Sequence, residues 1–167
     1  MILGASPIEG ELIVRAIVAT GLGSVVGLER SFRHKDAGLR TLALVALGSC
    51  AFATAGYAVL SLPALGQTRP DPTRIAAQVV SGVGFLGAGA IFVSGGQRIR
   101  GLTTAADIWL AAASGVLCGV GLLLTAAVVT ALGLGVVICF APAAYWFRKR
   151  EAKAKGLALR DEDSDLS

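Results

Sequence analysis

Two long stretches of this chain, 41–62 and 122–147, contain no charged residue. A helix needs about 20 apolar residues to cross the roughly 30 Å hydrocarbon core of a bilayer, and each stretch is long enough to do so. Hydrophobic residues make up 54% of the 167 positions, so most of the chain is available for spanning helices rather than for a water-soluble domain. We therefore predict an all-α membrane protein.

Three less apolar segments complete a prediction of five transmembrane helices. They cover 8–28, 74–93 and 104–120, and charged residues or glycine-rich turns bound them. Together with 41–62 and 122–147 they form one transmembrane domain over 1–147, followed by a short cytoplasmic tail over 148–167. Gly119-Val120-Gly121 predicts a tight antiparallel turn between the last two helices. The first segment lacks the basic start of a cleavable signal peptide and is expected to remain.

The basic residues predict the side of the membrane that each connection faces. Twelve of the 15 Lys and Arg residues follow the first, third and fifth segments, and such residues concentrate in cytoplasmic loops. We therefore expect the N-terminus outside and the C-terminus in the cytoplasm. The twelve residues are Arg30, Arg33, Lys35, Arg40, Arg98, Arg100, Arg148, Lys149, Arg150, Lys153, Lys155 and Arg160.

Small residues at helical spacing predict the faces on which the helices pack. Lipid tails are as apolar as Leu, so helices in a membrane associate where small side chains let their backbones approach. The candidates are Gly23 and Gly27 in the first segment, Gly84 and Ala88 in the third, and Gly115 and Gly119 in the fourth.

The second and fourth segments open alike, with Gly38-Leu39-Arg40-Thr41 and Gly101-Leu102-Thr103-Thr104. Each opening follows a helix with a small face and a basic loop. The similarity indicates a parallel repeat of two helical hairpins, with the fifth helix added. Chance similarity between glycine-rich helices is the alternative.

Two further patterns resemble ligand sites but are interpreted as packing. Gly82-Val83-Gly84-Phe85-Leu86-Gly87 has the spacing of a dinucleotide-binding loop, yet it sits inside an apolar segment, without the strand and water-exposed turn which that loop needs. Cys50, Cys118 and Cys139 match neither a metal knuckle nor a disulfide framework. We interpret them as small packing residues.

Asp107 is the one acid well inside the predicted spans, and an ionisable group at that depth indicates function by default. Thr104-Ala105-Ala106-Asp107 also fits a capping box at the start of a helix, where the helix dipole favours a carboxylate. Both interpretations stay open.

Arg15, Gln78 and Ser81 are the other candidate polar residues within the spans. For Arg15 three arrangements are possible: a hydrogen bond with Gln78, extension of its long side chain toward the outer interface, or pairing with Glu11 one turn away.

A candidate polar cluster lies at the cytoplasmic side, where the second and fourth helices begin. Helix N-termini beside Arg and hydroxyl donors suit an anion, such as a phosphate group or an acidic segment of a partner. Basic residues that only face anionic lipid headgroups are the alternative. The cluster comprises Glu29, Arg30, Arg40, Thr41, Arg100, Thr103, Thr104 and Asp107.

Five stretches resemble the MgtC/SapB family of bacterial membrane proteins. They are Gly27-Leu28-Glu29-Arg30, Ala37-Gly38-Leu39-Arg40-Thr41, Leu44-Val45-Ala46-Leu47-Gly48, the segment 74–89 with its Gly82-Val83-Gly84-Phe85-Leu86-Gly87, and Arg100-Gly101-Leu102-Thr103-Thr104-Ala105-Ala106. The resemblance covers 13 to about 120. It departs at Asp107, where Ser or Thr is expected, and in having only a short tail in place of an ACT-like domain, as in shorter SapB-type members.

The resemblance implies a multi-pass protein of the bacterial cytoplasmic (inner) membrane, linked to adaptation to low magnesium and to virulence. Some members are named Mg²⁺ transporters. Others resemble regulators that act on membrane partners, including the F-type ATP synthase.

The acidic residues bear on the choice between transport and regulation. Mg²⁺ binds through oxygen ligands and sheds water reluctantly, and Asp107 is the single shallow acid available as a metal ligand in the spans. We therefore expect a non-enzymatic membrane regulator, forming a homo-oligomer and binding no nucleic acid. The alternative is a Mg²⁺ or other ion transporter or channel, in which several copies of Asp107 surround one axis.

Overall fold

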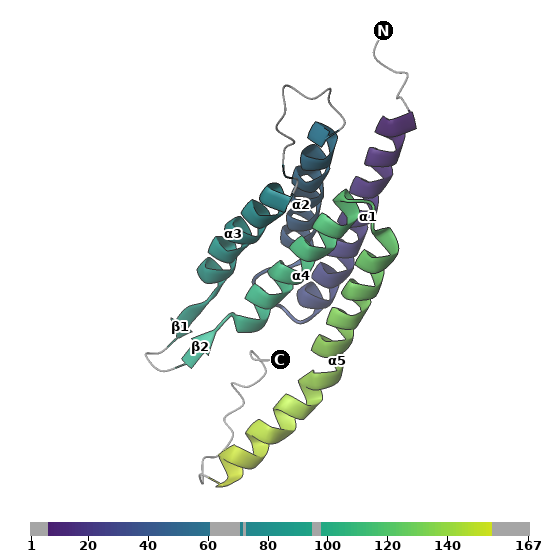
Figure 1. Cartoon of the computed structure of the whole chain (residues 1–167). Helices are drawn as coiled ribbons and strands as arrows, with labels where there is room; N and C mark the ends of the chain where they lie inside the picture. Colours follow the sequence, from purple (N-terminus) through teal and green to yellow (C-terminus); the bar gives the residue numbers. More distant parts are fainter. Residues whose placement is uncertain (1–6, 61–70, 72, 95–97, 155–167) are drawn as a thin grey trace. The chain divides into compact units, whose positions relative to one another are not determined.

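The structure, a computed structural model, describes residues 7–60, 71, 73–94 and 98–154. It contains five α-helices (Figure 1). The helices are α1 (Pro7–Phe32), α2 (Leu39–Leu60), α3 (Thr73–Ala90), α4 (Leu102–Gly119) and α5 (Leu123–Ala154). The predicted all-helical class with five helices is confirmed, and α5 continues past residue 147 into the segment predicted as tail.

Two short strands that the sequence did not predict lie between α3 and α4. Strand β1 (Phe92–Ser94) pairs antiparallel with β2 (Arg98–Arg100), with Val93 opposite Ile99. Both residues of this pair are β-branched, and such residues favour cross-strand pairing. The basic connection expected after the third segment therefore includes a β-hairpin.

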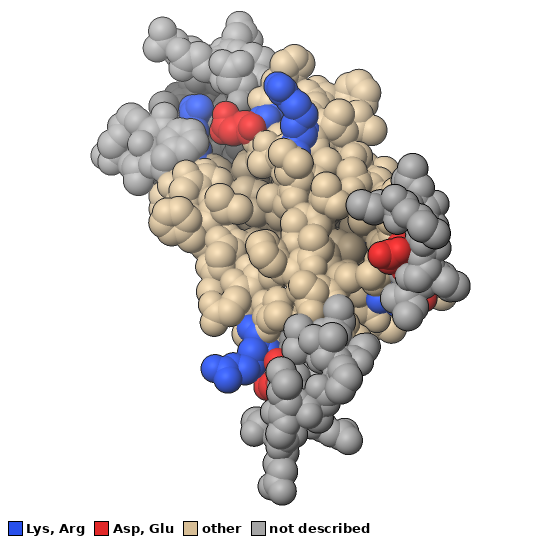
Figure 2. All heavy atoms as spheres, turned by 90° about the horizontal axis from the view of Figure 1, so that it is seen from above, with Lys and Arg blue, Asp and Glu red and all other residues tan. Residues whose placement is uncertain are grey.

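Four helices are long and apolar enough to cross a membrane. They are α1, α2, α4 and α5, over Glu9–Phe32, Leu39–Tyr57, Leu102–Gly119 and Leu123–Ala141. Helix α3 is not among these four, because Arg74, Gln78 and several glycines lower the hydropathy of its 18 residues. A spanning role for α3 stays a prediction. Figure 2 shows one face on which the described charged side chains leave a broad uncharged surface between them.

The chain divides into two compact units, Met1–Thr130 and Ala131–Ser167, with the boundary inside α5. The first unit holds α1 to α4, the hairpin and the first two turns of α5. In the second unit the described part of α5 exposes large apolar side chains, including Leu132, Phe140 and Trp146.

Helices α1, α2 and α4 form the centre of the first unit, where each contacts the other two. Glycines make these contacts close: a Cβ at Gly23 or Gly27 of α1 would lie 2.5 Å from backbone atoms of α2, and one at Gly119 of α4 would lie 2.6 Å from the Cys50 carbonyl oxygen. A Cβ at Gly115 of α4 would likewise overlap the carbonyl oxygen of Ala46 in α2. Four of the predicted packing glycines therefore lie at helix contacts.

Helix α3 packs against α4 and α2 through a different face from the predicted one. Val83 and Gly87 are buried, and Gly87 faces Ala105 and Trp109 of α4. Of the predicted small stripe, Ala88 is exposed, and a Cβ at Gly84 would meet no atom within 4 Å. The stripe is thus left without a partner within the described part of the chain.

The turn between α4 and α5 depends on a glycine in the left-handed region. Gly121 has φ 89°, its N–H bonds to the Cys118 carbonyl at 2.9 Å, and the Leu122 N–H bonds to the Leu117 carbonyl at 2.9 Å. Such paired bonds close a helix C-terminus, and glycine adopts this φ without a steric cost. The tight turn predicted from Gly119-Val120-Gly121 lies here.

Gly115→Ala is expected to destabilise the protein by about 1–3 kcal/mol, because the new methyl group would overlap the α2 backbone. Gly48→Ala is the matched control, since a Cβ at Gly48 meets nothing within 4 Å, and removing a helical glycine is expected to stabilise by about 0.5–1 kcal/mol. Thermal unfolding of both variants in detergent measures the difference. Equal midpoints would contradict the close contact of α4 with α2.

Candidate functional site

A buried ion pair joins α1 to α4. Arg30 Nε lies 3.1 Å from Asp107 Oδ2, and the two side chains are only 4% and 3% exposed. Arg30 also donates a hydrogen bond of 2.7 Å from Nη2 to the Thr104 hydroxyl oxygen, one turn before Asp107. One arginine thus binds two side chains on the same face of α4.

The helix ends favour this arrangement. Arg30 belongs to the last turn of α1, where the helix dipole attracts a cation, and Asp107 lies in the N-terminal part of α4, where it favours an anion. Burying two charges is costly, and the loss of one partner leaves the other uncompensated in an apolar environment. The pair therefore fixes the registry of α1 against α4.

Glu29 and Arg33 extend the cluster along α1. Their ion pair measures 2.6 Å from Glu29 Oε1 to Arg33 Nε, with Glu29 12% exposed and Arg33 33% exposed. Glu29 also lies within electrostatic range of Asp107. Two carboxylates and two guanidiniums balance, so these four residues have no net charge.

Several buried polar atoms of the cluster have no hydrogen bond among the described residues. They are Glu29 Oε1 and Oε2, Arg30 Nε, Arg100 Nε and Asp107 Oδ2. Three of these atoms belong to the two ion pairs, whose geometry is too oblique for a hydrogen bond. Ordered water is the usual partner of such atoms.

The capping-box interpretation of Asp107 is wrong. Helix α4 begins at Leu102, its N-cap is Gly101 with φ 87°, and no side chain of this described stretch makes a cap hydrogen bond. The glycine places the helix start two residues earlier than predicted, so Asp107 lies in the second turn, where its carboxylate reaches Arg30 instead of the orphan N–H groups.

The predicted cluster is only partly brought together. Arg30, Thr104 and Asp107 are buried and in contact, with Glu29 beside them, whereas Arg40, Thr41 and Thr103 are exposed. Arg100 is half-buried at the end of β2. The exposed Arg and Thr residues lie near the starts of α2 and α4, and the anion site predicted there stays a hypothesis.

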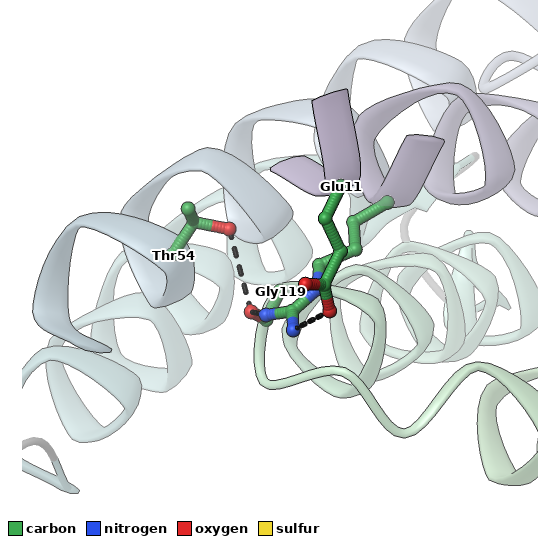
Figure 3. A network of polar contacts seen from close by, with 4 residues as sticks. Glu11, Thr54 and Gly119 are labelled. Atoms are coloured by element: carbon green, nitrogen blue, oxygen red, sulfur yellow. Dashed lines mark hydrogen bonds and ion pairs between the residues drawn. The ribbon is translucent and has the colours of Figure 1, made fainter. Parts of the chain in front are cut away.

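Arg15 makes a second link between α1 and α4, at the opposite end of α4 (Figure 3). Its Nη1 donates to the Gly119 carbonyl at 2.9 Å, and its Nη2 lies 2.5 Å from Glu11 Oε1. The Thr54 hydroxyl of α2 also donates to the Gly119 carbonyl, at 3.4 Å. Pairing with Glu11 was one of three predicted arrangements, and the bond to the last residue of α4 was missed because its acceptor is backbone.

Gln78 and Ser81 lie apart from these links. Both are exposed on α3, and Ser81 donates a hydrogen bond of 3.2 Å to the Ala77 carbonyl of its own helix. Gln78 lines a groove of about 500 Å³ between α2 and α3, which also includes Gly48, Phe52 and Gly82.

Ser114 and Thr130 form a polar contact that sequence reasoning missed. Their hydroxyl oxygens lie 2.8 Å apart, both residues are buried, and each hydroxyl also bonds to a carbonyl of its own helix. The contact joins α4 to the first turns of α5. A hydroxyl in each of two adjacent apolar helices was the available signal.

No group of three or more His, Cys, Asp or Glu residues that could hold a metal ion occurs in the described ranges. The charge of Asp107, the predicted metal ligand, is directed at Arg30. A Mg²⁺ ion at this carboxylate would have to compete with a guanidinium.

Arg30→Met is expected to destabilise the protein by about 3–5 kcal/mol, because it leaves Asp107 charged, buried and unpaired. Asp107→Leu is expected to act similarly on Arg30, and the double variant should be more stable than either single variant. Arg33→Met is the control, with a smaller effect because Arg33 is partly exposed. Unfolding in detergent supplies the double-mutant cycle; strictly additive losses would contradict direct pairing.

Comparison with known proteins identifies the family. A model of the MgtC family matches residues 16–146. The chain is 54% identical over 109 residues to Protein MgtC of Brucella suis, covering 65% of this chain and 42% of the relative. It is 52% identical over 116 residues to "Putative magnesium transporter YhiD" of Escherichia coli, covering 67% and 52%.

A third relative is Protein MgtC of Salmonella choleraesuis, 42% identical over 145 residues, with 86% of this chain and 58% of the relative covered. The chain thus matches about half the length of these curated relatives. No solved structure matches it. The family match and the four apolar helices together show that this chain is a multi-pass bacterial membrane protein belonging to the MgtC family.

Proposed function

We propose that this protein acts in magnesium homeostasis as a non-enzymatic regulator in the bacterial inner membrane, through contacts with itself or with another membrane protein. Two kinds of name support the link to magnesium: the MgtC family and the relative named a magnesium transporter. The proposal gives this chain no catalytic role.

The buried Arg30–Asp107 pair carries the preference for regulation over transport. A path for Mg²⁺ needs oxygen ligands that can replace hydration water. Here Asp107 faces a guanidinium, and the nearby Glu29 faces a second one. A divalent cation approaching this cluster meets two fixed positive charges, which makes the cluster an unfavourable place to bind Mg²⁺.

Transport is the second candidate, and the name of the E. coli relative favours it. In that case several copies of the chain would surround a common path, lined by backbone carbonyls of the glycine-rich helices. Whether the purified protein moves Mg²⁺ by itself therefore distinguishes transport from regulation.

The charge distribution supports the proposed topology, with the N-terminus outside and the C-terminus in the cytoplasm. The last turn of α1 meets the first turns of α4 at Arg30, Thr104 and Asp107, so the basic residues around these ends share one side of the first unit. That side is expected to be cytoplasmic. The parallel repeat of α1–α2 and α3–α4 belongs to the same proposal.

Self-association is proposed to use the outer face of α3. Ala77, Ser81 and Ala88 are exposed along it, and Gly84 is open. Small faces let helices pack in a lipid environment that offers no hydrophobic driving force, and a hydroxyl such as that of Ser81 can hydrogen-bond across such a contact. A second copy offers the same face, as a two-fold interface requires.

The transport question is tested by Mg²⁺ uptake into liposomes that contain the purified protein. We expect uptake no faster than in protein-free liposomes, because Arg30 and Arg33 occupy the available carboxylates. An added ionophore shows that the assay responds. Rapid uptake that a folded Asp107→Asn variant lacks would overturn the regulator proposal.

Gly84→Leu is expected to reduce self-association in lipid nanodiscs or detergent several-fold, because the new side chain would fill the face where a second copy packs. Gly21→Leu is the matched control, because a Cβ at this helical glycine also meets nothing within 4 Å, but Gly21 lies on α1. Native mass spectrometry counts the copies. Equal oligomer distributions for the two variants would exclude the α3 face.

A further inference from the structure

Two cysteines of different helices lie together in the centre of the first unit. Cys50 of α2 is 1% exposed and Cys118 of α4 is 0% exposed, and both are free thiols. They belong to one buried cluster, which Ala19 of α1 and Ala126 of α5 complete.

The backbones at this point are close enough for a covalent bridge to be considered. Gly119, next to Cys118, approaches the carbonyl of Cys50 so closely that a Cβ would lie 2.6 Å from its oxygen. A disulfide needs Cα atoms roughly 4.4–6.8 Å apart, a separation reached where glycine lets two helices touch. The other two buried members of the cluster, Ala19 and Ala126, are small, and partly buried apolar side chains such as Leu22 and Leu117 pack around it.

Polar groups connect this pair to the edge of the unit. Thr54 lies one turn along α2 from Cys50, and Gly119 follows Cys118 on α4. Arg15 and Thr54 both bind the Gly119 carbonyl, and the Arg15 side chain is 18% exposed. The two thiols therefore lie next to the polar contacts that Arg15 and Thr54 make with Gly119 (Figure 3), and not in a wholly apolar interior.

We propose that Cys50 and Cys118 form an oxidation-sensitive dithiol, which closes to a disulfide between α2 and α4 when a lipid-soluble two-electron oxidant such as a quinone is present. The two thiols lose two protons and two electrons as the sulfur–sulfur bond forms. The quinone takes up both protons and both electrons and becomes the hydroquinone. Reduction by a dithiol reverses the step.

The bridge would hold the α2–α4 contact covalently. That contact includes Gly115 and Gly119, so the oxidised protein keeps α4 fixed against α2 even when the weaker packing around it loosens. The third cysteine, Cys139, is exposed and belongs to the second unit, and the proposed pair does not include it.

The test uses the full chain in liposomes, oxidised with duroquinone, whose fully substituted ring does not add thiols. Remaining thiols are then alkylated with maleimide after unfolding in detergent, and the protein is digested without reductant. We expect a peptide pair joined through Cys50 and Cys118, a mass lower by two hydrogen atoms, and maleimide on Cys139 alone. A Cys139→Ser variant should form the same pair, and the oxidised protein should unfold at a higher temperature than the reduced one.

Cys50→Ala and Cys118→Ala are the matched variants, and each should leave its partner cysteine open to alkylation after oxidation. Maleimide on both Cys50 and Cys118 of the oxidised wild-type protein would overturn the proposal. So would a disulfide found only between copies through Cys139. The readout needs no folded variant, because the wild-type peptide map decides it.

Discussion

Close backbone contact of α2 with α1 and α4 is the constraint on which the rest of the first unit depends. In lipid, burial of apolar side chains gives helices no preference for each other over the acyl chains, so attraction comes from dense packing and from polar groups. The three backbones come close because glycines lie at the contacts, and small residues such as Ala46 lie opposite them. The glycines are Gly23, Gly27, Gly115 and Gly119. This spacing brings Arg30 within reach of Asp107 and places Cys50 beside Cys118.

Helix existence was predictable because charge-free length and small-residue spacing are local properties of the sequence. The direction in which each face of small residues points was not predictable from the sequence. Gly23 and Gly115 lie at contacts, but Gly84, at equivalent spacing on α3, faces away from the other described helices. Spacing shows which residues share a face of a helix, whereas the neighbour that covers this face depends on the tertiary arrangement. The β1–β2 hairpin was missed because Phe92 and Val93 were assigned to the third span, and Arg98 and Arg100, which lie in β2, to a basic loop.

The candidate site could likewise be predicted only in part from the sequence. Arg30, Thr104 and Asp107 were all placed in the predicted cytoplasmic cluster. Which of its members touch could not be predicted, because the contact joins residues far apart in the sequence. The capping interpretation of Asp107 failed because Gly101, in the left-handed region, starts α4 earlier than its hydroxyl residues suggested. Pairing of Arg15 with Glu11 was one of three arrangements that the sequence left open, while its bond to the Gly119 carbonyl could be seen only in the fold.

Helix α4 is held at both ends by arginines of α1, and this distinguishes it from α3. Arg30 binds its first turns, and Arg15 binds its last carbonyl, where a cation also complements the helix dipole. Among the described residues, no side-chain hydrogen bond or ion pair joins α3 to another helix, so its contacts with α2 and α4 are those of apolar packing. Moving α4 would break two charged links, whereas moving α3 would break none. Under the proposed function, a membrane partner would therefore meet the least resistance at α3, the helix whose small outer face is open.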